Sequence, residues 1–206
     1  MAASEVSICN AALQLIKNTK SITALTQGTK EANACEVVFD ELRDTMLECH
    51  NWNFATKRVQ LARLADAPAF EWDYQYQLPA DYLRVVRLSE NSDARDNCPY
   101  RIENGKILTD ASEIYLRYVA RVEDPNLMPA TFRTAMSKLL ASRLAVALAQ
   151  SAALSKEMYT QYTGEDLPTA KSADSIQDYP ENLPESPWVT TRYGGYVYYE
   201  PGDPPS

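Results

Sequence analysis

The sequence predicts an α+β fold: a helical bundle formed from both ends of the body, a small antiparallel β-unit inserted between them, and an extended C-terminal arm. Three observations predict this class. Apolar residues recur with helical spacing at both ends of the body, they alternate with polar residues between, and the last forty or so positions are enriched in proline and acidic residues. We expect residues 1–58 and 125–162 to form the bundle, 59–124 the β-unit and 163–206 the arm.

The N-terminal part of the chain predicts two antiparallel helices. The first follows Ser4, a candidate N-cap, and gathers its apolar residues on one face. After the linker SITALTQGTK, a second helix repeats apolar residues at steps of four and three, while its charged residues mostly occupy other faces. Its apolar seam comprises Cys35, Phe39, Leu42, Met46 and Cys49. The four cysteines, which also include Cys9 and Cys98, form no CxxC pair and are expected to be unpaired, as in a reducing cytoplasm.

In the middle of the chain, apolar and polar residues alternate with a period of two. Residues 74–78 and 114–119 alternate, and residues 83–88 are rich in branched side chains. Asn104 and Gly105 stand between two short runs, and this dipeptide favours a type I′ hairpin turn because both positions need positive φ. We expect a small antiparallel β-unit here.

A third helix is predicted from about Pro129 to Tyr162. It is rich in alanine and leucine and is apolar nearly all round between residues 139 and 149, so other elements must cover most of its sides. Gly164 and Pro168 interrupt the helical pattern, and the helix is expected to end before them.

Residues 163–206 differ in kind from the body. They hold seven of the twelve prolines and eight acidic residues against two basic ones, so this segment carries −6 of the net charge of −8. Tyrosine and tryptophan are residues that anchor interfaces, which predicts a docking arm that folds onto a partner. The expected contact residues are Trp188, Arg192, Tyr193, Tyr196, Tyr198 and Tyr199.

One stretch, ECHNWNFATKR at residues 48–58, collects reactive residue types. It contains His50, the chain's single histidine, which has no second histidine for a metal site and no evident nucleophile to deprotonate. His50 is expected to complement the negative end of a helix dipole, and Cys49 to be a small buried residue of the seam. Trp52 and Phe54 are expected to be a structural joint between bundle and β-unit. The sequence therefore predicts no catalytic residue, metal ligand or cofactor site.

Two other functional classes remain open. Any two of the 28 acidic residues could converge as general acid and base, which keeps a peptidoglycan hydrolase that uses a carboxylate pair as the alternative function. A host adaptor domain that uses its tail as a peptide ligand is a third reading. P-loop, dinucleotide-binding, HExxH and GxSxG motifs do not occur in the sequence.

The order of several motifs resembles the head-to-tail adaptor proteins of tailed bacteriophages, also called tail tubular protein A or gatekeeper-type connectors. The resemblance covers about residues 7–149, with a weaker echo in ESPWVTTR near the C-terminus. It rests on ICNAALQLI, FDELRDTMLECHNWNFATKRVQL, YQYQLPADYLRVVRL and IYLRYVARVEDPNLMPATFRTAMSKLLASRLA. The most specific pieces are residues 43–58, which contain WNFA, and YQLPADYLR at residues 76–84.

The resemblance implies a structural role in the virion. Members form a ring, usually a dodecamer, that joins the portal protein above to the tail nozzle or tube protein below, while double-stranded DNA passes through the middle. The helical part builds the ring, the β-part faces neighbouring copies or the tail, and a C-terminal arm reaches along the portal. Because the chain is acidic, its ring is expected to repel DNA phosphates, so that double-stranded DNA passes through the channel without specific binding. The expected location is the head–tail junction, after assembly in the host cytoplasm; no apolar run approaches the roughly 20 residues that span a membrane.

Overall fold

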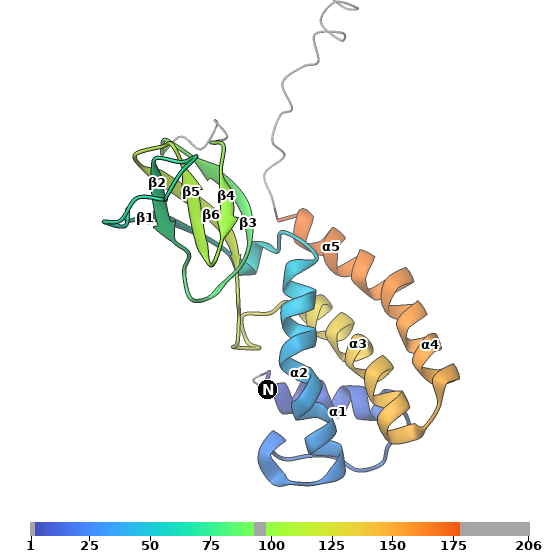
Figure 1. The fold of residues 1–206 in the computed structure, drawn as a ribbon. Helices are drawn as coiled ribbons and strands as arrows, with labels where there is room; N and C mark the ends of the chain where they lie inside the picture. Colours follow the sequence, from blue (N-terminus) through green and yellow to red (C-terminus); the bar gives the residue numbers. More distant parts are fainter. Residues whose placement is uncertain (1–2, 93–97, 178–206) are drawn as a thin grey trace, which may run out of the picture.

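The computed structural model describes residues 3–92 and 98–177, and these form a helical bundle that carries a β-unit (Figure 1). The bundle comprises α1 (Glu5–Leu15), α2 (Lys30–Glu48), α3 (Ala130–Ala149), α4 (Ala152–Gln161) and α5 (Leu167–Ser175). The chain enters the β-unit after α2 and returns to the bundle at α3. The predicted α+β class is therefore confirmed, with helices from both ends of the body and an inserted antiparallel unit.

The first two helices begin at the side chains that cap them. Ser4 Oγ accepts a hydrogen bond from the Ser7 amide at 3.1 Å, and Ser7 Oγ accepts one from the Ser4 amide at 3.0 Å. Thr29 caps α2 by accepting from the Ala32 amide. Asn10 fixes the linker between α1 and α2, because its side chain both donates to and accepts from the Ile22 backbone.

The third predicted helix differs from the structure in two ways: it was expected to be continuous and to end before Gly164. It is broken at Gln150, whose φ of 50° is left-handed, and α4 begins after the Ser151 N-cap. Beyond α4 the chain stays helical: a π-helical segment, η3 (Tyr162–Asp166), leads directly into α5. Gly164 and Pro168 therefore do not end the helix, because the shifted π ladder and the first turn of α5 accommodate a residue without an amide hydrogen. The predicted arm cannot begin at residue 163, since helical structure reaches Ser175.

The β-unit consists of two antiparallel three-stranded sheets. One has the order β1 (Thr56–Leu61), β6 (Ile114–Ala120), β3 (Tyr82–Ser89), and the other β2 (Tyr74–Gln77), β5 (Lys106–Thr109), β4 (Arg101–Glu103). The hairpin between β4 and β5 turns at Asn104 and Gly105 with φ of 46° and 71°, which confirms the predicted turn. Tyr76, Ile107 and Leu116 belong to the core between the sheets.

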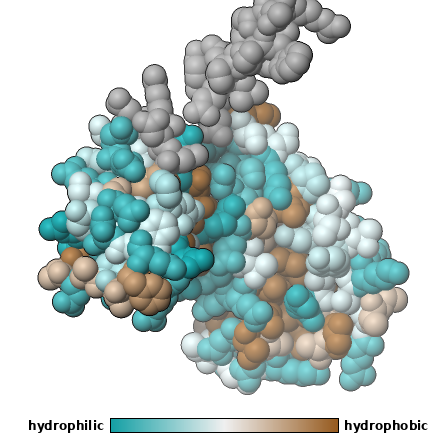
Figure 2. Space-filling model, turned by 45° about the horizontal axis from the view of Figure 1, so that its top comes forward, coloured by the Kyte–Doolittle hydropathy of each residue, from teal (hydrophilic) through white to brown (hydrophobic). Residues whose placement is uncertain are grey.

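Two apolar cores meet where the β-unit joins the bundle. The bundle core takes in Val119 of β6, and Leu83 and Val86 of β3 pack against it. In the space-filling view the β-unit and the bundle form two lobes, and hydrophilic residues cover much of the visible face of the β-unit (Figure 2). Among the helices described, none is both long and apolar enough to cross a membrane.

Candidate functional site

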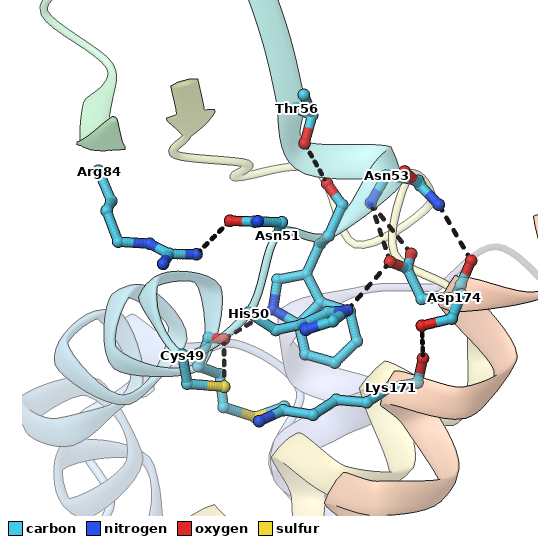
Figure 3. A network of polar contacts seen from close by, with 11 residues as sticks. Cys49, His50, Asn51, Asn53, Thr56, Arg84, Lys171 and Asp174 are labelled. Carbon is cyan, nitrogen blue, oxygen red and sulfur yellow. Dashed lines mark hydrogen bonds and ion pairs between the residues drawn. The ribbon is translucent and has the colours of Figure 1, made fainter. Parts of the chain in front are cut away.

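The segment that links α2 to β1 runs through a short 3-10 turn, η2 (Asn53–Ala55), and carries the clustered residues of the sequence (Figure 3). Trp52 is 1% exposed, and its Nε1 donates to the Met46 carbonyl oxygen at 2.8 Å. Its ring meets Phe132 of α3 edge-on, with centroids 5.0 Å apart, and Phe54 contacts the same Phe132 at 5.0 Å. The two aromatic residues expected at the joint thus pack on one side chain of the bundle.

Asp174 of α5 fastens the last helix to this linker. Its side chain is 3% exposed, and its two carboxylate oxygens accept from the Asn53 amide at 3.0 and 3.1 Å. The Asn53 side chain donates in return to the Asp174 carbonyl oxygen at 3.0 Å. These bonds connect residues 121 positions apart and satisfy a charged group that would otherwise be buried without partners.

His50 also has a partner in Asp174, which the sequence did not reveal. Its Nε2 lies 3.5 Å from the Asp174 carboxylate, and its ring is edge-on to Trp52 at 4.8 Å. Burial lowers the pKa of His50 below its usual value, and the Asp174 carboxylate opposes this only in part. Burial therefore favours the neutral imidazole over the charged form.

Cys49 is not the buried seam residue that the helical spacing indicated. Because α2 ends at Glu48, Cys49 is the C-cap residue and is exposed, although its Sγ turns back to donate to the Met46 carbonyl oxygen at 3.1 Å. Desolvation of the thiol raises the pKa of Cys49. Nucleophilic cysteines need a lowered pKa, so this Cys, His and Asp grouping lacks an activated thiol.

A second polar network joins α1, α2 and the strand that leaves the β-unit. Arg43 is buried and lies 3.8 Å from Glu5, 2.9 Å from Asp40 and 3.4 Å from Asp44. Arg121, just after β6, donates to both oxygens of Asp44, at 3.1 and 2.9 Å. The alternation of charges on α2 placed these residues on solvated faces, and no sequence pattern indicated that Arg43 would be enclosed.

One cavity has two carboxylate residues in its lining, which bears on the hydrolase alternative. It measures about 380 Å³ and is lined by Ala80, Asp81, Arg121 and Glu123. Although burial opposes it, hydrogen bonds from Lys57 and Tyr118 hold the pKa of Asp81 below its usual value. A general acid needs a raised pKa, so Asp81 is unsuited to that role.

The remaining expectations concern metal sites and the arm. Within residues 3–92 and 98–177, no group of three or more His, Cys, Asp or Glu side chains could hold a metal ion. The portal-docking residues predicted from the sequence lie outside the described residues: Trp188, Arg192, Tyr193, Tyr196, Tyr198 and Tyr199.

The arrangement around residues 49–56 thus holds elements together: it ties α2, α3 and α5 to the first strand of the β-unit. Asp174 is the residue that sequence reasoning missed, because residues 163–206 were assigned to an acidic docking arm. The sequence carried no signal for it, because Gly164 and Pro168 predict the end of a helix that in the structure continues to Ser175. Comparison with known protein families and with curated proteins finds no match for this chain.

Proposed function

We propose that this chain is a structural head-to-tail adaptor of a tailed bacteriophage. In this proposal, copies of the chain form a ring, a dodecamer as in the family that the sequence resembles. The ring joins the portal protein to the tail nozzle or tube and surrounds part of the DNA channel. The function rests on assembly, and it requires rigid subunits that hold a fixed shape under load.

The observation that carries the proposal is where the two most specific motifs lie. Residues 43–58 include the end of α2, the Trp52 joint and the start of β1. Residues 76–84 run from β2 of one sheet into β3 of the other, past the Asp81 carboxylate that bonds Lys57 and Tyr118. Both motifs therefore occupy positions that set the angle between parts of the body, as expected for a shape-determining protein.

Charge supports the same proposal. The net charge of −8 disfavours tight binding of a phosphate backbone, and a channel that carries DNA must let it slide. An acidic ring meets that requirement.

The experiment is reconstitution with the portal protein of the same phage. The purified chain, mixed with portal, is expected to give ring-shaped complexes that electron microscopy resolves beneath the portal. Removing residues 179–206 should leave a helix-rich body but abolish co-sedimentation with portal. Replacing Tyr159 of α4, which is 52% exposed, by serine is the matched loss of a surface aromatic and should leave docking intact. Absence of any ring with the full chain would refute the adaptor function.

A further inference from the structure

The outward face of α2 has one exposed apolar side chain with a carboxylate on each side of it. Val37 is 78% exposed. At about 100° of rotation per residue, Glu36 lies about 100° to one side of Val37 and Glu41 about 40° to the other. Both carboxylates are exposed, and neither forms an ion pair within residues 3–92 and 98–177. We call these three residues the acidic face.

A groove of the opposite charge lies between α3 and α4. It has a volume of about 350 Å³, and Val146, which is 56% exposed, is part of its lining. Arg143 of α3 and Lys156 of α4 line its two walls, and no carboxylate is among the described residues of its lining. The carboxylate of Glu157, next to Lys156 in sequence, accepts a hydrogen bond from Gln161 instead. We call this the basic groove.

The charges of the basic groove are as free as those of the acidic face. In the part of the chain that the structure describes, neither Arg143 nor Lys156 forms an ion pair. Elsewhere in the bundle the chain does pair its charges: Lys138 lies 2.9 Å from Asp166. A solvated charge needs no partner, and a single exposed apolar residue is common. The informative observation is therefore the match between the two surfaces.

Each surface has an exposed valine between two like charges, and the sign of those charges is opposite. Two packed helices form a groove into which the side chains of a third helix can fit. With α2 laid along the basic groove, Val37 would meet Val146. The carboxylates on its two sides would then face the cations on the two walls. Such complementarity sets orientation and excludes wrong partners.

The partner that these surfaces fit is a second copy of the chain. Packing two acidic faces together would oppose carboxylates, and packing two basic grooves together would oppose cations, so the contact must join unlike surfaces. Figure 1 shows α3 between α2 and α4, so one subunit carries the two surfaces on different helices of the bundle. A contact between unlike surfaces leaves one of each free and closes into a ring where the rotation per copy allows it.

We infer that the acidic face of one copy docks in the basic groove of the next. The inference rests on the proposed function, in which such contacts close the ring, and it names the surfaces that make them. The contact is electrostatic at its edges and apolar at its centre. High salt should therefore weaken it without abolishing it.

Cross-linking between two differently tagged full-length copies tests the contact. One copy carries Asn33→Cys, one turn before Val37, and the other carries Ala152→Cys in the groove. Both also carry Cys49→Ser, because Cys49 is exposed and the other three cysteines are buried. A short bis-maleimide should link the two copies, both at high concentration alone and with portal protein. Absence of the link under both conditions would overturn the inference.

Two controls show whether the link is specific. Gln60→Cys, exposed on β1, replaces Asn33→Cys in the first control and should reduce the linked fraction at least tenfold. In the second, both copies carry Asn33→Cys and should not link. Efficient linking there would mean that α2 packs on α2 of a neighbour, which contradicts docking in the groove.

Charge reversal tests the pairing of the surfaces. When both copies carry Glu36→Lys and Glu41→Lys, the link should fall at least tenfold, because like charges then face each other. Arg143→Glu with Lys156→Glu on both copies should do the same. Linking should return when the copy with Asn33→Cys has the reversed acidic face and its partner has the reversed groove. Only folded variants can restore the link, so failure of this rescue would overturn the pairing.

A matched change of net charge completes the set. Lys17→Glu with Arg58→Glu reverses two exposed cations outside the groove and should leave the link unchanged. An equal loss in this variant would reduce the effect to net charge and overturn the pairing. Tyr159 also lines the groove, yet Tyr159→Ser keeps both cations and Val146, so rings and their docking to portal should persist.

Electron microscopy of the same samples separates this inference from the adaptor function. Rings beneath the portal without the cross-link would overturn the contact and leave the adaptor function standing. The cross-link without any ring would support the contact between copies and refute the adaptor function.

Discussion

His50 links the stability of the joint to pH. Burial keeps its pKa in the folded chain below the usual 6.5, so the unfolded chain takes up a proton at a pH where the folded chain does not. The free energy of unfolding should therefore be undiminished above about pH 6.5 and fall as the pH drops below it. Urea unfolding at pH 7.5 and 5.5 measures the difference. His50→Gln should show a smaller loss between these values, and an identical loss would contradict the assignment.

Glu5 provides an opposite and separable contribution. Burial raises the pKa of Glu5, against the attraction of Arg43, so its effect on stability is lost as the pH rises through the carboxylate range. Comparing His50→Gln with wild type at the same two pH values isolates the contribution of His50, because Glu5 is present in both chains.

Two tryptophans in different hydrogen-bonding situations make a matched pair. Trp52 Nε1 donates to the Met46 carbonyl oxygen, whereas Trp72 Nε1 is buried with no hydrogen-bond partner among the residues that the structure describes. Trp52→Phe should lower the free energy of unfolding by about 1–3 kcal/mol, because a buried acceptor loses its donor. Trp72→Phe removes an unsatisfied donor and should be neutral or stabilising. Urea unfolding of the two variants and of wild type measures the change in the free energy of unfolding for each substitution. Equal losses of stability in the two variants would contradict the predicted difference.

Only some residues of the joint could be predicted from the sequence. Trp52 and Phe54 could be expected there because large aromatics at a change of period are usually buried between units. Asp174 could not, since hydrogen bonds such as that to Asn53 depend on tertiary contacts that leave no local pattern.

At the scale of elements, the helix after residue 130 departs most from expectation. Local propensity predicted its start and its need for cover but missed the break at Gln150, where a non-glycine residue adopts a left-handed conformation. It also ended the helix too early, because Gly164 and Pro168 are poor helix formers. Packing of α4, η3 and α5 along α3 outweighs those preferences.

Gly164 provides a test of that continuity. A Cβ at Gly164 would meet no atom within 4 Å, and its backbone is helical. Gly164→Ala should therefore raise the free energy of unfolding by about 0.5–1 kcal/mol. Gly28→Ala is the control: that site is equally open, but its φ of 75° disfavours alanine, so the variant should be destabilised. Chemical denaturation decides between a gain and a loss, and a loss at Gly164 would contradict a helix through this position.

At the scale of the whole molecule, composition and period were sufficient for the α+β class and for the insertion of the β-unit between helices. They were not sufficient for the pairing of six strands into two sheets. That pairing depends on contacts such as Thr56 with Val119, which are far apart in sequence.

The shared core predicts that bundle and β-unit unfold together. Val119 of β6 is fully buried in the bundle core, and Trp52 joins the same core from the linker. Trp52→Ala should lower the free energy of unfolding by about 3–5 kcal/mol, since it removes a large buried ring. Native-state hydrogen exchange should show that loss equally for protected amides of α3 and β6. Phe70→Ala removes a ring that is 75% exposed and should change stability by less than about 0.5 kcal/mol. If Trp52→Ala weakened protection in α3 but left β6 unchanged, the two units would be independent, and a rigid subunit could not rely on this joint.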